Sequence, residues 1–131
     1  MAVLTTFIVE DSPLILDALV SMLQELTPVQ VVGSAADESH AVAWLDEPGH
    51  ACELLIVDIM LKSGSGLGVL RRTAHSAVPV RRVVLTNHAT PDMRAACRAL
   101  GAERVFDKSG ELEDLIAYCE HVGEHVARPH A

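Results

Sequence analysis

The chain has 131 residues, which suits one domain of ordinary size, and half of its residues are apolar. Its formal net charge is −8, from 10 lysines and arginines against 18 aspartates and glutamates. An acidic chain without a basic run is a poor candidate for direct binding to nucleic acid or to an anionic membrane surface. No stretch approaches about 20 consecutive apolar residues, so no membrane-spanning helix is expected.

The three cysteines, Cys52, Cys97 and Cys119, are odd in number and widely spaced. This pattern fits reduced thiols better than a disulfide framework. The N-terminus lacks the basic start and the small-residue cleavage site of a signal peptide. We therefore expect a cytoplasmic protein.

The first half of the chain alternates between strand-like and helix-like segments. Residues 4–10 predict a strand, and Ser12-Pro13 is typical of a helix N-cap followed by proline in the first turn. Apolar residues then recur at helical spacing, at Ile15, Leu19, Met22, Leu23 and Leu26. Residues 29–35 predict a second strand, and Asp37 is expected to be the N-cap of a second helix. The largely apolar run at 53–58 predicts a third strand.

The second half continues the alternation. A glycine-containing loop at 64–68 is expected to run into the third helix. The remaining strands and helices are expected at 80–86, 90–100, 104–106 and 111 to about 124. Gly101 is expected to end the fourth helix, and Ser109 to cap the last one.

Five strand–helix repeats predict an α/β fold, with a doubly wound, five-stranded parallel sheet and helices on both faces. The strands are continuous apolar runs rather than alternating ones, which favours parallel strands buried on both sides. The sequence contains no linker and no low-complexity stretch. We expect one domain over residues 1–126 and a short tail over 127–131.

Polar side chains stand at the carboxyl ends of four strands, where open α/β sheets bind their ligands. They are Glu10 and Asp11, Asp58, Thr86 and Lys108, in chain order. Three converging carboxylates repel one another strongly, and this arrangement persists where a cation binds them. Oxygen ligands without histidine or cysteine favour Mg²⁺, Ca²⁺ or Mn²⁺ over zinc.

The motifs around these residues read VEDS, IVDIM, VLTN and FDKS. In these motifs, and over roughly residues 3 to 123, the sequence resembles the receiver domain of two-component response regulators. Each motif is weak alone, but all four in order at the right strand ends are specific. The resemblance implies a flavodoxin-like (βα)5 fold and a stand-alone receiver, a phosphoprotein whose only reactions are its own phosphorylation and autodephosphorylation.

The resemblance also implies a role for each carboxylate. Asp58 would accept a phosphoryl group from a sensor histidine kinase or a histidine phosphotransfer protein, giving an aspartyl phosphate. Asp11 and Asp58 would bind Mg²⁺ directly, with Mn²⁺ able to replace it. Glu10 would act on the metal through water, and Met60 would contribute its backbone carbonyl.

Two further residues complete the site that the resemblance implies. Lys108 would pair with Asp58 at rest and with a phosphoryl oxygen afterwards. Thr86 would turn to bond another phosphoryl oxygen. Met60 and His88 are expected to flank the approach of water to the phosphorus.

The sequence departs from the usual receiver pattern at four positions. Ser109 follows the lysine, and Lys62 lies in the loop after the phosphoacceptor. Asn87 follows the switch threonine, and Val105 occupies the position of the switch aromatic. Phe106 is the nearest aromatic, and strand alternation points it to the opposite face of the sheet. The coupling between threonine and aromatic is therefore expected to be weakened or rerouted.

Signalling is expected through protein contacts on the face of the fourth helix, fifth strand and fifth helix. Candidate surface residues there are Thr90, Arg94, Arg98 and Arg104.

One alternative is a degenerate receiver that binds partners without phosphorylation. A second is an aspartyl-phosphate hydrolase, although its usual second aspartate is replaced by Met60. The pairs Arg71-Arg72 and Arg81-Arg82 indicate solvated surface, with a docking patch as the alternative.

Overall fold

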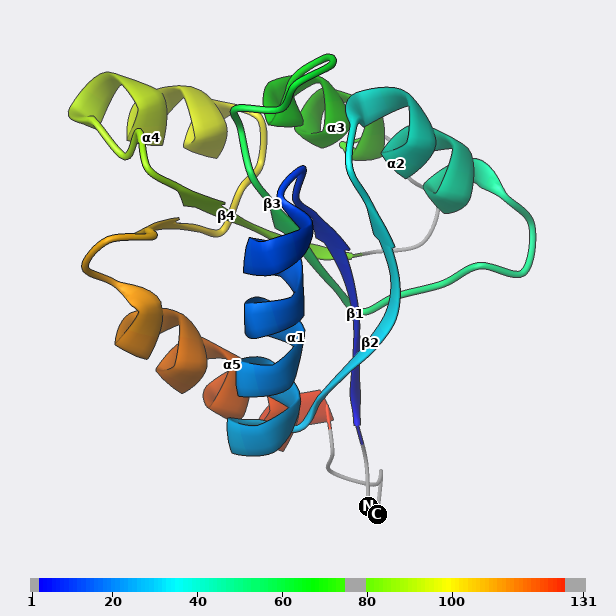
Figure 1. Cartoon of the computed structure of the whole chain (residues 1–131), viewed down its shortest axis with the longest axis vertical. Coiled ribbons are helices and arrows are strands. Elements are labelled where there is room, and N and C mark those ends of the chain that lie inside the picture. The colour runs from blue at the N-terminus through cyan, green and yellow to red at the C-terminus, as the bar shows by residue number, and fades with distance from the viewer. Residues whose placement is uncertain (1–2, 75–79, 127–131) are drawn as a thin grey trace.

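Five parallel strands form one sheet in the computed structural model, which describes residues 3–74 and 80–126 (Figure 1). The strands are β1 (Leu4–Val9), β2 (Val29–Ala35), β3 (Leu54–Val57), β4 (Arg81–Thr86) and β5 (Arg104–Asp107). The helices are α1 (Pro13–Leu26), α2 (Glu38–Asp46), α3 (Gly66–Thr73), α4 (Pro91–Ala99) and α5 (Leu112–Val126). The predicted alternation of strands and helices is confirmed.

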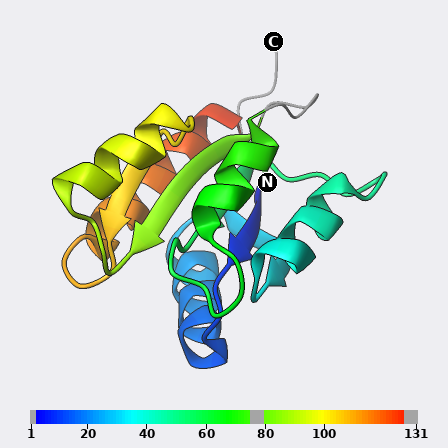
Figure 2. The same ribbon diagram turned by 90° about the horizontal axis from the view of Figure 1, so that it is seen from above.

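The strand order across the sheet is β2-β1-β3-β4-β5, and every neighbouring pair is parallel. Helices α1 and α5 cover one face, while α2, α3 and α4 cover the other (Figures 1 and 2). This is the flavodoxin-like order, in which the chain reverses its direction of winding between β1 and β3. The carboxyl ends of these two strands therefore border a crevice.

Alternate residues of each strand enter two separate hydrophobic cores. Leu54 and Ile56 of β3 join the core under α1 and α5, whereas Leu55 and Val57 join the core under α2, α3 and α4. All four are at most 1% exposed, which explains why this strand is a continuous apolar run. Every described cysteine is buried and free, as expected.

Most of the predicted helix ends are correct. The predicted N-caps Ser12 and Asp37 accept hydrogen bonds from the first turns of α1 and α2. Thr90, where the fourth helix was expected to begin, does the same for α4. Gly101 follows α4 with a φ of 96°, a conformation that favours glycine.

The predicted cap at Ser109 is wrong. Its amide and hydroxyl both donate to Asp107 Oδ1, at 2.8 and 2.6 Å, and α5 begins later, at Leu112. The Asp107 carboxylate therefore holds the serine in the preceding loop and prevents it from capping the helix.

Helix α3 begins at Gly66, inside the predicted glycine loop. A side chain at Gly66 would meet the backbone carbonyl of Asp58, and one at Gly68 would meet the Glu38 carboxylate. The same carboxylate accepts a hydrogen bond from the Ser65 amide at 2.9 Å. Gly66 therefore lets the start of α3 pack against the segment that follows β3, and Gly68 lets it pack against the start of α2. None of the described helices combines the length and apolarity needed to cross a membrane.

Candidate functional site

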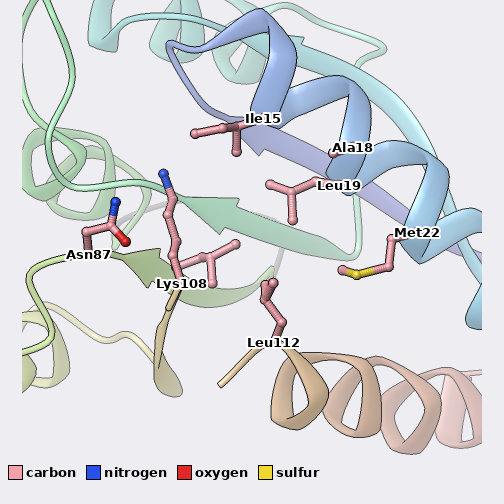
Figure 3. Close-up of a pocket in the computed structure, with 8 residues that line it drawn as sticks. Ile15, Ala18, Leu19, Met22, Asn87, Lys108 and Leu112 are labelled. Atoms are coloured by element: carbon pink, nitrogen blue, oxygen red, sulfur yellow. The ribbon is translucent and has the colours of Figure 1, made fainter. Parts of the chain in front are cut away.

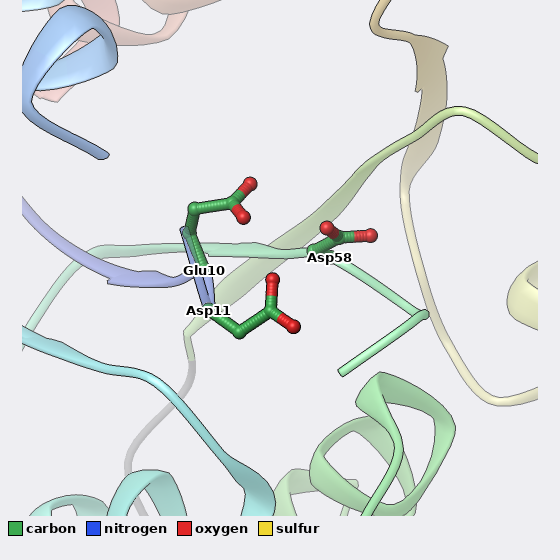
Figure 4. Close-up of side chains that lie close together, drawn as sticks. All are labelled: Glu10, Asp11 and Asp58. Carbon is green, nitrogen blue, oxygen red and sulfur yellow. The ribbon is translucent and has the colours of Figure 1, made fainter. Parts of the chain in front are cut away.

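Three carboxylates meet at the carboxyl ends of β1 and β3. Glu10, Asp11 and Asp58 each offer an oxygen within 4.8 Å of the others (Figure 4). Glu10 is only 3% exposed and Asp58 only 6%, while Asp11 is half-buried. The predicted acidic cluster is therefore present, and two of its members are withdrawn from bulk water.

Hydrogen bonds fix the orientation of Asp58. Its backbone amide donates to the Val9 carbonyl at 3.0 Å, which extends the β1–β3 pairing by one residue. Its Oδ1 accepts a hydrogen bond from the Met60 amide at 3.2 Å. Its Oδ2 lies 2.6 Å from Lys108 Nζ. The carboxylate is thus held between the loop after β3 and the loop after β5.

The other two carboxylates are held differently. Glu10 accepts hydrogen bonds from Lys108 Nζ at 2.6 Å and from the Ser12 amide at 3.0 Å, so both of its oxygens are engaged. Asp11 accepts a hydrogen bond from the Lys62 amide at 2.9 Å and makes no ion pair within residues 3–74 and 80–126. Asp11 therefore brings its charge to the cluster without a neutralising cation.

Lys108 lies between two of these carboxylates. Its backbone amide donates to the Thr86 carbonyl at 3.0 Å, which aligns the end of β5 with the end of β4. Burial acts to lower the pKa of the Lys108 ammonium, but hydrogen bonds to Asp58 and Glu10 outweigh burial and raise that pKa. Lys108 is therefore protonated over the whole physiological range.

A polar cavity of about 190 Å³ opens onto these groups. Its lining residues are Glu10, Asp11, Ser12, Ile15, Asp58, Met60, Asn87, His88 and Lys108. Thr86 is adjacent but does not line this cavity; it is fully buried, and its hydroxyl accepts a hydrogen bond from the His88 amide at 3.2 Å. The structure thus brings Thr86 beside the site with its hydroxyl engaged elsewhere.

A second, mostly apolar cavity of about 290 Å³ adjoins the first between α1 and the start of α5 (Figure 3). It is lined by Ile15, Ala18, Leu19, Met22, Leu85, Asn87, Lys108 and Leu112. Ile15, Asn87 and Lys108 belong to both cavities.

The two residues near the expected aromatic switch point in opposite directions. Val105 joins the core under α2, α3 and α4, whereas Phe106 joins the core under α1 and α5 and packs edge-on against Tyr118. The alternation predicted for Phe106 is confirmed, so its ring lies on the other side of the sheet from α4.

Arg94 was expected on the surface, and the structure leaves it partly exposed. Its side chain is 29% exposed and donates to the carbonyls of Ala89 and Val105 and to the Glu111 carboxylate. Neither Arg94 nor Glu111 stands at a strand end, so the strand-end reasoning could not find them.

The donor set fits a hard divalent cation. All three side chains offer carboxylate oxygens, and the one ammonium that bonds to them leaves the cluster with excess negative charge. Mg²⁺ and Ca²⁺ prefer such oxygen ligands, whereas zinc prefers nitrogen and sulfur.

Comparison with known proteins identifies the family. A family model described as the response regulator receiver domain matches residues 6–120. The response regulator UvrY of Escherichia coli K12 is 23% identical over 114 residues, covering 87% of this chain and 51% of UvrY. The transcriptional regulatory protein YvfU of Bacillus subtilis is 31% identical over 112 residues, covering 83% of this chain and 54% of that protein. The chain thus spans about half the length of these curated relatives.

Solved structures share the fold. A LuxR-family two-component response regulator from Aurantimonas superposes with a TM-score of 0.83 at 18% identity, covering 95% of this chain and 87% of that one. A Burkholderia pseudomallei response regulator, solved with a phosphorylated aspartic acid and a calcium ion, gives a TM-score of 0.76 at 20% identity, covering 93% and 69%. The fold, the strand-end cluster and the match over residues 6–120 agree, and the chain belongs to the response regulator receiver domain family.

Proposed function

We propose that Asp58 accepts a phosphoryl group from a phosphohistidine of a sensor histidine kinase or a histidine phosphotransfer protein. The observation that carries this proposal is the buried Asp58 carboxylate, which lines an open polar cavity and bonds to the Lys108 ammonium at 2.6 Å. A carboxylate oxygen attacks the phosphorus, the phosphorus–nitrogen bond breaks, and its electron pair returns to the imidazole. The product is an aspartyl phosphate.

Lys108 and Thr86 would stabilise the transferred group. Phosphoryl transfer needs positioning and charge neutralisation rather than covalent help from the protein. The ammonium already bonds to Asp58, so it lies where the new phosphoryl oxygens would form, and Glu10 keeps it in place from the other side. Thr86 would turn its hydroxyl away from the His88 amide to donate to a phosphoryl oxygen.

A bound Mg²⁺ would neutralise part of the charge on the phosphoryl oxygens. We assign Asp11 and Asp58 as its direct ligands, with the Met60 carbonyl, and Glu10 as a ligand through water. Glu10 suits the indirect role because Lys108 and the Ser12 amide already engage both of its oxygens. Mn²⁺ shares the preference for oxygen ligands and would replace Mg²⁺.

We infer that the phosphorylated domain, expected over residues 1–126, signals through protein contacts on the face formed by α4, β5 and α5. Thr90, Arg98 and Arg104 are exposed on this face. The hydrolase alternative is not favoured, because the thioether of Met60 stands where an acid or base would be needed. The degenerate-receiver alternative is not favoured, because the cluster, its lysine and its threonine are all present.

Phosphorylation by acetyl phosphate tests the proposal. Intact-mass spectrometry of the wild-type chain should show one added phosphoryl group with Mg²⁺ and far less without it. Asp58→Asn should show none. Asp46→Asn is a matched control, because Asp46 is an exposed aspartate of α2 whose nearest cation, Arg72, lies 3.4 Å away.

Equal phosphorylation of Asp58→Asn and the wild-type chain would refute the assignment of Asp58. If neither acetyl phosphate nor a phosphorylated histidine phosphotransfer protein modified the wild-type chain, the phosphoacceptor function itself would be wrong.

A further inference from the structure

Arg94 connects three separate segments beside the site. From α4, its Nε donates to the Ala89 carbonyl in the loop after β4, at 3.0 Å. Its Nη1 donates to the Val105 carbonyl of β5 at 2.9 Å. Its Nη2 pairs with Glu111 Oε1 at 2.6 Å, just before α5. One guanidinium therefore ties α4 to both ends of the polypeptide stretch that contains Lys108.

Glu111 closes that stretch into a fixed loop. The Glu111 oxygen that pairs with Arg94 also accepts a hydrogen bond from the Asp107 amide at 2.8 Å. The Glu111 amide in turn donates to the Asp107 carbonyl at 2.8 Å. Within the loop, Ser109 donates twice to the Asp107 carboxylate. Residues 107–111 therefore behave as one unit, and Lys108 is part of it.

The loop reaches the phosphoacceptor through Lys108. The Lys108 amide bonds to the end of β4, and its ammonium bonds to Asp58 and Glu10. A shift of the loop would move the ammonium relative to Asp58. The position of that ammonium therefore depends on the contacts that hold residues 107–111, and Arg94 supplies the contacts that come from α4.

We propose that Arg94 is a positioning residue for Lys108: through Glu111 it holds the loop 107–111 so that the ammonium meets Asp58, and it makes this geometry depend on the position of α4. The proposal rests on the proposed function, in which Lys108 stabilises the transferred phosphoryl group.

An arginine suits this role better than a lysine. Its planar guanidinium presents donors in several fixed directions, so one side chain serves a carbonyl on each of two segments and a carboxylate on a third. A hydrogen bond from Arg94 and another from the Asp107 amide lower the pKa of Glu111, so the partner is ionised at neutral pH. Lysine would keep the charge but could not reach all three acceptors.

Phosphorylation rates, measured in the wild-type chain and in a Lys108→Met variant, test the proposal. With acetyl phosphate and Mg²⁺, Arg94→Ala should lower the rate about tenfold, and Arg94→Lys should lower it severalfold despite the retained charge. Asp92→Ala is the matched control on the same helix, because Asp92 is exposed and its described contacts include no side-chain hydrogen bond or ion pair; its rate should stay within about twofold of the wild-type rate.

The second background carries Lys108→Met, which keeps the aliphatic stem and removes the ammonium. If Arg94 acts through Lys108, adding Arg94→Ala to this variant should cause little further loss of rate, although it should still lower the melting temperature. An equal loss of rate in both backgrounds would show a general structural role and overturn the proposal. An unchanged rate in Arg94→Ala alone would also overturn it.

Amide hydrogen exchange of the unphosphorylated protein separates this proposal from the proposed function. Arg94→Ala should speed exchange of the Asp107 and Lys108 amides about tenfold, while Asp92→Ala should leave them unchanged. If the wild-type chain accepted no phosphoryl group but this exchange pattern held, the phosphoacceptor function would fail and the positioning of the loop would stand. Unchanged exchange in Arg94→Ala would refute the positioning.

Discussion

Lys108 balances two carboxylates at once, and Asp11 adds a third negative charge nearby. Glu10 and Asp58 are almost completely buried, so water screens their repulsion poorly. The ammonium lies 2.6 Å from each of them. In the resting site, the repulsion between the carboxylates therefore destabilises the fold, and the Lys108 ammonium stabilises it.

This balance predicts opposite effects of two substitutions on the free energy of unfolding. Asp58→Asn removes one of the repelling charges and should stabilise the protein by about 1 kcal/mol. Lys108→Ala leaves buried carboxylates without their cation and should destabilise it by roughly 3 kcal/mol. Urea unfolding measures both, with Asp46→Asn as an exposed control. Shifts of the same sign for the two site variants would contradict this account of the charges.

Met60 and His88 are expected to govern a different property, the lifetime of the proposed aspartyl phosphate. Both line the polar cavity, and Met60 is 55% exposed. A thioether is a weak acceptor and cannot orient an attacking water well. We therefore expect slow autodephosphorylation.

A polar residue at position 60 should shorten that lifetime. Met60→Asn provides an amide that can hold water, and we expect hydrolysis to accelerate about tenfold, equal to about 1.4 kcal/mol of activation free energy. Loss of phosphate after removal of acetyl phosphate measures the rate. A slower rate in Met60→Asn, or a much larger effect of His88→Ala, would show that Met60 is not the residue that shields the phosphorus.

At the scale of the elements, Arg82 joins the ends of two helices. Its Nη1 donates to the carbonyls of Leu70 near the end of α3 and Leu100 after α4, at 2.8 and 3.0 Å. The last carbonyls of a helix lack partners within the helix, and a cation suits that end of the helix dipole. Arg81, its neighbour, instead forms a half-exposed ion pair with Glu103. The two arginines therefore differ: the solvated surface predicted for both describes Arg81, whereas Arg82 is partly buried.

Arg82→Ala should lower the free energy of unfolding by about 2 kcal/mol, because it removes charge-assisted hydrogen bonds that two helix ends share. Arg81→Ala should cost less than about 1 kcal/mol, as is usual for exposed ion pairs. Urea unfolding of both variants gives the comparison, and hydrogen exchange should show faster opening at the ends of α3 and α4 in Arg82→Ala. Equal costs for the two variants would refute the capping role of Arg82.

The bounds of the elements were predictable where local chemistry decides them. Ser12, Asp37 and Thr90 cap helices through bonds to residues three positions away, and such bonds can be read from sequence. Ser109 failed as a cap because a nearer carboxylate, Asp107, competes for it. Gly66 was assigned to a loop, although it begins α3. Glycine is needed there because a side chain would meet the backbone of Asp58, and this tertiary contact cannot be read from the local sequence.

At the scale of the whole molecule, the parallel sheet explains why the acidic site could be predicted. Glu10 and Lys108 are 98 positions apart in the sequence, yet both follow strands whose carboxyl ends share one edge of the sheet. Strand ends can be found from apolar runs. The hydrogen-bond partners of Arg94 and Arg82 could not be predicted in this way. The partners of a long side chain depend on how helices and strands pack, and the periodicity of apolar residues does not reveal that packing.

The same convergence of strand ends predicts that Mg²⁺ stabilises the whole fold. A cation that binds the native cluster of Glu10, Asp11 and Asp58, but not the unfolded chain, shifts the folding equilibrium by mass action. At a Mg²⁺ concentration ten times the dissociation constant, the gain should be about 1.4 kcal/mol. For a domain of this size that gain corresponds to a rise of about 5 °C in melting temperature.

Thermal melts in Mg²⁺, and in NaCl of the same ionic strength, measure this gain without general salt effects. Asp58→Ala should lose most of the rise, because it removes a buried ligand, whereas the exposed-site variant Asp46→Asn should keep it. Glu10→Gln should keep part of it, since Glu10 is expected to act through water and its oxygens are engaged by Lys108 and the Ser12 amide. An equal rise in the wild-type chain and Asp58→Ala would mean that Mg²⁺ stabilises the protein elsewhere, and no rise at millimolar Mg²⁺ would rule out the site.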